Sequence, residues 1–472
     1  MTFFASLALV VVLVIRPQEI WPALEALRLL DVCTGLVVLG LLVDLALGKH
    51  RYLYSPQLPL LGAFVGTAYF VTALTLGTAR GLTLGFNEAA IPAVFMLAIT
   101  YGSSTLPRMR AMIWTLLLLA GFVAAVAVHQ GNVSPVCIEE TADDSGVLEP
   151  DLDKVDGRVC GLPSDCRQEG DNGAEWACER LGLFKTISTH RRVRWRGQLN
   201  DPNELSVFIG GVIPLLFAVG LPLRNAASKR GPQLQRLLAI VSVAMIGVGL
   251  YAVILTQSRG GQLVIATALL FMFVTRFGKK GVFVALLAAL PVLLLGGRED
   301  ADAEDSTMER LELLTEGVTL VIAHPFRGVG LDQFADQVAS PAHQTAHNSY
   351  LLAAAETGFP GFFFWSGVVW TSLKVPITAV KRMSLSPEIR AIATALLVSF
   401  SGIAVGIFFL SFTYKQLLFV WFGLAGALYI IMREADPDVR VTFGWKDAAG
   451  IALADLGVIA LLYVYTRARG GP

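Results

Sequence analysis

Residues 110–129, RAMIWTLLLLAGFVAAVAVH, form an apolar run of the length that a helix needs to cross a bilayer, roughly 20 residues. Residues 3–15 form a shorter run with no basic stretch before it and no small-residue cleavage site after it, so we interpret it as a retained span. The other expected spans are residues 27–48, 57–77, 82–102, 204–222, 237–256, 261–276, 280–296, 358–379, 391–412, 415–432 and 448–466. The sequence therefore predicts an all-α, polytopic integral membrane protein with about 12–13 transmembrane helices.

The composition supports this class. Hydrophobic residues make up 54% of the 472 residues and charged residues 16%, whereas about a quarter of the residues in a soluble domain are charged. The formal net charge is zero, so the chain lacks the basic excess of a nucleic-acid-binding surface.

The distribution of Lys and Arg predicts the orientation of the chain, because cytoplasmic loops carry an excess of both. With a cytoplasmic N-terminus, six alternate loops are basic, whereas the short loops between them hold one basic residue each. Two long segments, 130–203 and 297–357, then lie on the outer side. They separate three expected groups of transmembrane helices, residues 1–129, 204–296 and 358–472.

The first outer segment holds four of the five cysteines and many acidic residues. We expect a solvated, partly disordered surface that two disulfides tie down in an oxidising compartment, although the sequence does not choose among the three possible pairings. Zinc is the alternative, but the spacing contains no C-x-x-C pair. The disulfide candidates are Cys137, Cys160, Cys166 and Cys178.

A basic stretch follows the acidic loop and leads to the next span. Attraction to anionic lipid headgroups or to the acidic loop just upstream is a sufficient explanation for Arg191 and Arg192. Arg194 and Arg196 instead precede the turn Asp201-Pro202-Asn203, which would fix the backbone at the entrance of a helix. These two arginines are therefore candidate ligand-binding residues.

Arg259 lies between two apolar runs, followed directly by Gly260 and Gly261. An ionisable residue in such a place suggests a functional site, and the glycines allow another backbone or a ligand to approach closely. The structural alternative is that Arg259 caps free carbonyls at a helix end.

The second outer segment combines an expected amphipathic helix with histidines. Ser306-Thr307-Met308-Glu309 matches a capping box, and apolar residues follow it at helical spacing. His347 lies just before the next span and is the first candidate for proton transfer, although a lone histidine near a helix start is more often structural. His343 lies four residues before His347, but no acidic third ligand is placed in a recognisable pattern, so we expect no metal.

Arginines and a histidine on one face suggest two chemical roles, phosphate binding and proton transfer. Guanidinium groups bind phosphate oxygens in a bidentate way, and an imidazole can take a proton from a hydroxyl. The substrate implied is a phosphate-bearing lipid in the bilayer that an alcohol attacks.

Four motifs, in this order and spacing, resemble the O-antigen ligase and polymerase family of bacterial envelope proteins over about residues 190–410. The four-cysteine acidic loop departs from the family pattern, which leaves recognition of the acceptor open. The motifs are Arg194-Trp195-Arg196-Gly197 with Asp201-Pro202-Asn203, Ser258-Arg259-Gly260, His324-Pro325-Phe326-Arg327-Gly328-Val329-Gly330, and His347-Asn348-Ser349-Tyr350.

The resemblance implies a fold like that of C-type glycosyltransferases, in the bacterial inner membrane and with a periplasmic active site. The donor would be a glycan on undecaprenyl diphosphate, used without metal or other cofactor. Arg194 and Arg259 would bind the diphosphate and stabilise its developing charge. His347 would be the general base, and displacement in one step would invert the anomeric centre.

Further residues of the same motifs are expected to contact substrate. These are Arg196, Asn203, Asn348 and Tyr350, with Arg196 as the substitute for Arg194 if the first motif is read two residues later.

Three acceptors remain open: lipid A-core for an O-antigen ligase, a growing glycan for a surface polysaccharide polymerase, and a protein for an O-oligosaccharyltransferase. A non-enzymatic transporter of lipid-linked glycans is the other alternative. A transporter is expected to show internal repeats and charged residues in mid-span, whereas the charged candidates here gather at one rim.

Overall fold

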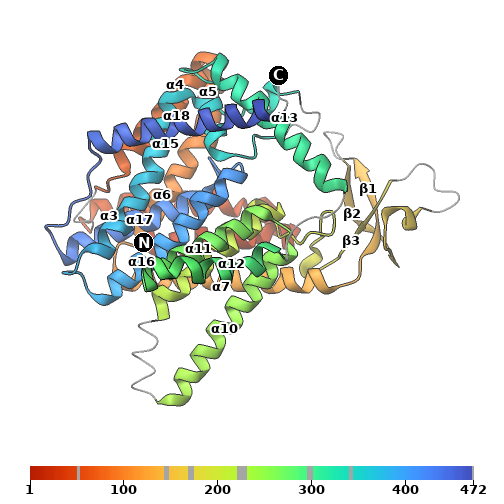
Figure 1. Cartoon of the computed structure of the whole chain (residues 1–472), viewed down its shortest axis with the longest axis horizontal. Helices are drawn as coiled ribbons and strands as arrows, with labels where there is room; N and C mark the ends of the chain where they lie inside the picture. The colour runs from red at the N-terminus through yellow and green to blue at the C-terminus, as the bar shows by residue number, and fades with distance from the viewer. Residues whose placement is uncertain are drawn as a thin grey trace.

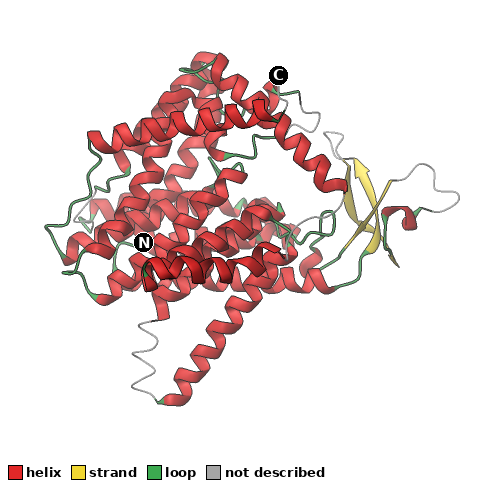
Figure 2. Cartoon of the chain, viewed as in Figure 1, coloured by secondary structure: helices red, strands yellow, loops and turns green. Residues whose placement is uncertain are grey.

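The computed structural model describes residues 1–49, 54–142, 148–167, 175–220, 231–294, 301–339 and 344–469. It is 76% helical, and 11 helices in these ranges are long and apolar enough to cross a membrane. The predicted all-α class is confirmed, and the chain is a multi-pass membrane protein. Figures 1 and 2 show the helices packed together, with the strands projecting from one end.

The N-terminal part contains short helices between longer ones. A π-helical segment, η2, joins α5 to α6 within one predicted span, residues 82–102. The elements are α1 (Thr2–Ile15), α2 (Pro17–Ile20), η1 (Pro22–Leu27), α3 (Leu29–Ala46), α4 (Leu58–Leu76), α5 (Thr78–Leu84), η2 (Gly85–Ala90), α6 (Ile91–Gly102) and α7 (Leu106–Asn132).

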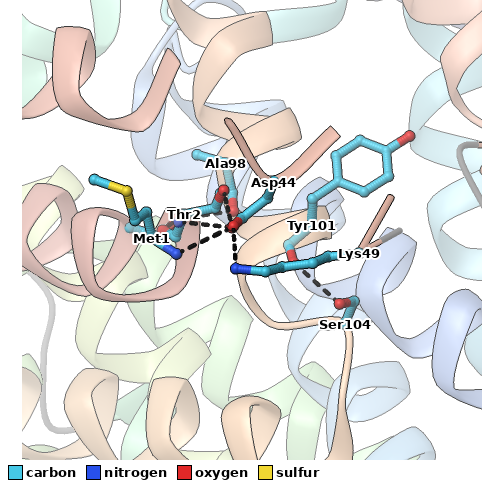
Figure 3. Close-up of polar contacts among 8 residues, drawn as sticks. Met1, Thr2, Asp44, Lys49, Ala98, Tyr101 and Ser104 are labelled. Atoms are coloured by element: carbon cyan, nitrogen blue, oxygen red, sulfur yellow. Dashed lines mark hydrogen bonds and ion pairs between the residues drawn. The ribbon is translucent and has the colours of Figure 1, made fainter. Parts of the chain in front are cut away.

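Helix α1 is fixed to α3 by a carboxylate that is almost fully buried (Figure 3). Asp44 accepts hydrogen bonds from the backbone N–H of Thr2 at 3.0 Å and from its hydroxyl at 2.8 Å. The Asp44 carboxylate also pairs with the Met1 ammonium at 3.1 Å and with Lys49 at 3.2 Å. A buried carboxylate needs partners of this kind to remain ionised.

The second half of the chain contains the most deeply packed helices. The window of α17 that could span the membrane is 89% buried, and Gly423 of α17 lets Ile99 of α6 pack directly against it. The elements are α8 (Pro202–Val212), η6 (Ile213–Leu215), α10 (Pro232–Leu255), α11 (Arg259–Phe277), α12 (Lys279–Leu294), α13 (Ala301–Ala323), α14 (Phe334–Gln337), α15 (Ser349–Lys381), α16 (Pro387–Gly406), η7 (Ile407–Phe409), α17 (Gln416–Ala435) and α18 (Trp445–Ala468).

One predicted boundary differs from the structure. Helix α13 begins at Ala301, so the capping-box interpretation of residues 306–309 is wrong; the preceding Ala and Glu residues favour helix and extend it. Helix α12 agrees with the predicted span 280–296 over the described residues.

The cysteine-containing segment forms a small sheet over its described residues. The antiparallel strands β1 (Val136–Ala142), β2 (Leu148–Val159) and β3 (Glu175–Glu179) lie in the order β2-β1-β3. The short helix η3 (Pro163–Cys166) lies between β2 and β3. Disulfides join Cys137 to Cys166 and Cys160 to Cys178. The expectation of a partly disordered surface missed these strands.

The motif at residues 324–330 packs against a break in α15. Gly358 has φ +65°, and Pro360 has no N–H to donate to the carbonyl of Glu356. The N–H of Gly330 occupies that carbonyl at 3.0 Å, and the N–H of Val329 bonds to the carbonyl of Ala355 at 2.9 Å. Gly328, with φ +59°, lies so close that an added Cβ would be 2.3 Å from the Glu356 carbonyl oxygen.

We therefore expect Gly328→Ala to destabilise the protein by about 2 kcal/mol or more, from its positive φ and the clash with α15. The control is Gly62→Ala in α4, where an added Cβ meets nothing within 4 Å. Thermal unfolding of the purified proteins in detergent should show a lower Tm for Gly328→Ala alone. Equal Tm values would mean that α15 does not depend on this close approach.

Candidate functional site

His347 lies on the wall of a cavity of about 370 Å³ that segments distant in the sequence enclose. The walls come from η2, the start of α8, the loop before α14, the start of α15 and the loop before α17. The lining residues are Asn87, Glu88, Gln198, Asp201, Glu204, Asp332, Thr345, His347, Leu352, Glu356, Leu410, Ser411, Tyr414, Lys415 and Gln416.

His347 is held in an unusual backbone conformation directly before α15. Its φ is +47°, and the side chain of Asn348 then caps the helix by accepting hydrogen bonds from the N–H groups of Tyr350 (3.0 Å) and Leu351 (2.9 Å). Non-glycine residues with positive φ occur where the surrounding structure imposes them, often at functional sites. The cap therefore fixes His347 in the wall of the cavity.

Two hydrogen bonds of Gln344, one of them to Glu309 of α13, show which nitrogen of the His347 ring carries the hydrogen. Gln344 donates from Nε2 to the Glu309 carboxylate at 2.7 Å, and because a carboxylate only accepts, the other amide atom, Oε1, faces His347. His347 Nε2 lies 3.0 Å from this Oε1, so Nε2 carries the hydrogen and donates it. The lone pair of Nδ1 is then the proton acceptor of the ring.

Burial keeps the His347 ring neutral. Burial, assisted by the positive charge of Arg310, lowers the pKa of His347 to about 4, and the negative charge of Asp201 opposes this shift. The imidazole is therefore in its basic form at neutral pH.

The predicted arginines lie on two neighbouring segments outside the cavity lining. Arg192 is buried and joins these segments: its Nε donates to the carbonyl of Thr256 at 2.8 Å, and its Nη2 donates to Oδ1 of Asn203 at 2.9 Å. Arg194 is half-buried, with Nε donating to the carbonyl of Ile187 at 2.8 Å. The structure thus brings the Arg194 segment against the turn that precedes Arg259.

Arg259 itself is exposed at the start of α11, directly after Ser258, whose side chain caps that helix. No hydrogen bond or ion pair joins its guanidinium to another residue of the described ranges, so it does not cap a helix end there. Arg196 donates to the carbonyls of Phe184 and Lys185.

The other predicted contact residues have partners within the fold. Asn203 donates from Nδ2 to Asp201 at 2.8 Å while it accepts from Arg192. The hydroxyl of Tyr350 donates to the carbonyl of Ala404 at 2.8 Å, and its ring packs edge-on against Trp365. Nδ2 of Asn348 is buried without a hydrogen-bond partner among the described residues.

The carboxyl groups of the cavity were missed from the sequence. Burial and the charge of Asp336 raise the pKa of Asp332, against the effect of Arg80. Burial and the neighbouring Glu356 carboxyl raise the pKa of Tyr414 well above its usual value. A carboxyl group within or next to an apolar run is the signal that could have identified three of them: Glu88, Glu204 and Glu356.

The described residues contain one cluster whose ligand atoms lie within 4.8 Å of each other, formed by Cys137, Cys160 and Cys166. Each of these sulfurs is already in a disulfide. His343, the partner considered for His347, lies outside the described residues.

Residues 241–366 match the family model described as O-Antigen ligase. This segment of the chain is similar to the O-antigen ligase family. The matched segment runs from within α10 into α15 and includes Arg259, Asp332, His347 and Glu356, whereas Arg194 precedes it. No curated protein matches the chain. The predicted resemblance is confirmed, and the family implies glycan transfer by an enzyme of the ligase or glycosyltransferase type.

Proposed function

We propose that the protein transfers a glycan from undecaprenyl diphosphate to an acceptor hydroxyl, as an O-antigen ligase or surface polysaccharide polymerase. The observation that carries this proposal is the neutral His347 ring on the cavity wall, with its hydrogen on Nε2 and the Nδ1 lone pair available. A general base must be unprotonated and within reach of the hydroxyl that it activates.

The reaction is a single displacement. The acceptor O–H gives its proton to Nδ1 of His347, and the acceptor oxygen forms a bond to the anomeric carbon. The bond from that carbon to the phosphate oxygen breaks, and the electron pair leaves with undecaprenyl diphosphate. Attack opposite the leaving group inverts the anomeric centre.

The arginines would bind the diphosphate. Arg259 offers a guanidinium without a protein partner in the described ranges, and Arg192 holds the Arg194 segment against the turn before Arg259. Guanidinium groups that bind phosphate oxygens stabilise the charge that develops as the diphosphate leaves. This chemistry uses no metal ion.

The membrane orientation is part of the proposal. Alternating Lys and Arg loops favour a cytoplasmic N-terminus, which would place His347 and Arg259 on the periplasmic side of the bacterial inner membrane. Transfer to a protein hydroxyl would use the same donor chemistry and remains the alternative enzyme function.

We expect His347→Ala to lower the single-turnover transfer rate by about 10²–10⁴, the usual loss when a general base is removed. Binding of the lipid-linked donor should stay close to that of the wild type, because the arginines are intact. Both quantities are measured on purified protein after folded yield has been checked. Near-normal transfer by folded His347→Ala protein would exclude His347 as the base.

Arg194→Ala and Arg259→Ala should each reduce transfer by about 10²–10³, because each removes stabilisation of the leaving diphosphate. Arg191→Ala is the control, since Arg191 is exposed in the same basic stretch and its backbone N–H bonds to Glu179. Transfer rates with a polyprenyl-diphosphate-linked glycan test this difference. Equal, mild losses at all three positions would favour lipid-headgroup attraction instead.

Glu309 is predicted to be a positioning residue, since its carboxylate fixes the Gln344 amide and, through it, the proton on His347. In Glu309→Gln the new amide can also accept, so Gln344 can turn and place the hydrogen on Nδ1. We expect the transfer rate to fall at least about tenfold, as when a catalytic histidine loses its orienting carboxylate.

Donor binding and Tm of Glu309→Gln should not change. Glu309→Asp should recover part of the rate, and Glu312→Gln on the same helix, where the side chain is exposed, should have no effect. The assignment of the proton fails if Glu309→Gln and Glu312→Gln transfer equally fast.

A further inference from the structure

The cavity beside His347 is lined mainly by carboxyl groups and neutral hydrogen-bonding groups. Among the described residues that line it, the one cation is Lys415, which pairs with Glu204 at 3.2 Å. The acidic residues of the lining are Glu88, Asp201, Glu204, Asp332 and Glu356. The neutral polar residues of the lining are Asn87, Gln198, Thr345, Ser411 and Gln416. Carboxyl groups exchange hydrogen bonds with hydroxyls and, when ionised, repel anions.

Glu356 and Tyr414 give this cavity a pair of polar side chains with buried oxygen atoms. Glu356 is 2% exposed, and its Oε1 accepts a hydrogen bond from the N–H of Phe334 at 3.2 Å. The Glu356 carboxyl group also pairs with the hydroxyl of Tyr414, which lines the same cavity. A carboxyl oxygen has lone pairs for more than one hydrogen bond, so this pair can also bind a ligand hydroxyl.

The backbone holds Glu356 in a fixed place relative to His347. Its carbonyl bonds to Gly330, and Leu352, one turn earlier on α15, also lines the cavity. Glu356 comes seven residues after the first residue of α15, Ser349, which corresponds to about 10 Å along the helix. The cavity therefore extends along the first turns of α15, from His347 to Glu356.

The cavity is small. Its volume of about 370 Å³ lies at the lower end of the range for small-molecule sites, roughly 300–1,000 Å³. It fits the end of a glycan. The arginine side of the site, with Arg194 and Arg259 outside the lining, is the place for the anionic diphosphate.

We propose that this cavity is the acceptor site and that it takes a neutral, hydroxyl-bearing terminal sugar, with Glu356 as the residue that binds its hydroxyls. An acceptor whose terminal ring carries a carboxylate or phosphate is rejected. The proposal rests on the proposed glycan transfer, and it narrows the acceptor to one chemical class.

The test compares two probes on the purified full-length protein: neutral disaccharides, and matching disaccharides with a uronic acid as the terminal ring. Binding of each probe is measured without donor, and transfer is then measured with donor. The wild type should bind the neutral probes at least about tenfold more tightly. No binding of neutral probes, or a preference for the uronic acid, would overturn the proposal.

Glu356→Gln keeps the shape of the side chain and an acceptor for Phe334 N–H but removes the carboxylate. The dissociation constant and KM for the neutral probe should rise about tenfold, as expected when a hydrogen bond between the Glu356 carboxyl group and a ligand hydroxyl is lost. Donor binding should not change, and the preference over the uronic acid should shrink. Unchanged affinity and preference in this variant would also overturn the proposal.

Two further variants keep the result interpretable. Glu88→Gln changes a lining residue on another element, and it can be measured even if Glu356→Gln folds poorly. It should also reduce the preference for the neutral probe over the uronic acid. An unchanged preference in Glu88→Gln counts against the proposal. Glu312→Gln, exposed on α13, should bind both probes like the wild type. Because probe binding is measured without donor, it tests the acceptor site separately from His347→Ala, which tests the transfer chemistry.

Discussion

The break of α15 at Gly358 is the constraint on which the site depends. Pro360 leaves the Glu356 carbonyl without its helical partner, and Phe359 donates its N–H to the carbonyl of Pro325 at 2.7 Å instead of continuing the helix. The break leaves the carbonyls of Ala355 and Glu356 without helical partners. They accept hydrogen bonds from the N–H groups of Val329 and Gly330, respectively. The chain then continues to Leu331, whose N–H bonds to the hydroxyl of Thr72 in α4 at 3.0 Å, and so brings Asp332 into the cavity.

The acidic and the basic side chains of the site lie in different parts of it. Carboxyl groups line the cavity at the start of α15, whereas the arginines lie on the loop before α8 and on the turn between α10 and α11. Asp201 and Asn203 connect these two parts. Asp201 lines the cavity and acts on His347, while Asn203 bonds to both Asp201 and Arg192. A donor with a diphosphate and an acceptor with hydroxyls need two such environments on either side of one base.

The helical membrane fold could be predicted because apolar runs of about 20 residues are a strong signal in a single sequence. His347 and Arg259 could be selected because ionisable residues are rare next to such runs. The cavity could not be predicted, because its lining comes from residues as far apart as Asn87 and Gln416, and no local pattern brings them together. The roles of Gln344 and Glu309 likewise depend on the contact between α13 and the loop before α15. The strands of the cysteine segment were not predicted, because its acidic composition is typical of a solvated, partly disordered loop.

The disulfide-linked sheet has a structural connection to the arginines. Glu179, at the end of β3, accepts hydrogen bonds from the hydroxyl of Ser188 and from the N–H of Arg191 at 3.0 Å. Thr189 and Arg192 pair through two backbone hydrogen bonds across a tight turn, in which His190 and Arg191 both have positive φ. Such a turn strains residues other than glycine, asparagine or aspartate, so it needs support from outside.

The Glu179 carboxylate supplies this support, and the bond between Cys160 and Cys178 fixes the strand that carries it. The turn leads directly to Arg192, whose side chain reaches Thr256 and Asn203. The bond between Cys160 and Cys178 thus lies next to the carboxylate that holds the turn, and the turn sets the position from which Arg192 bonds to Thr256 and Asn203.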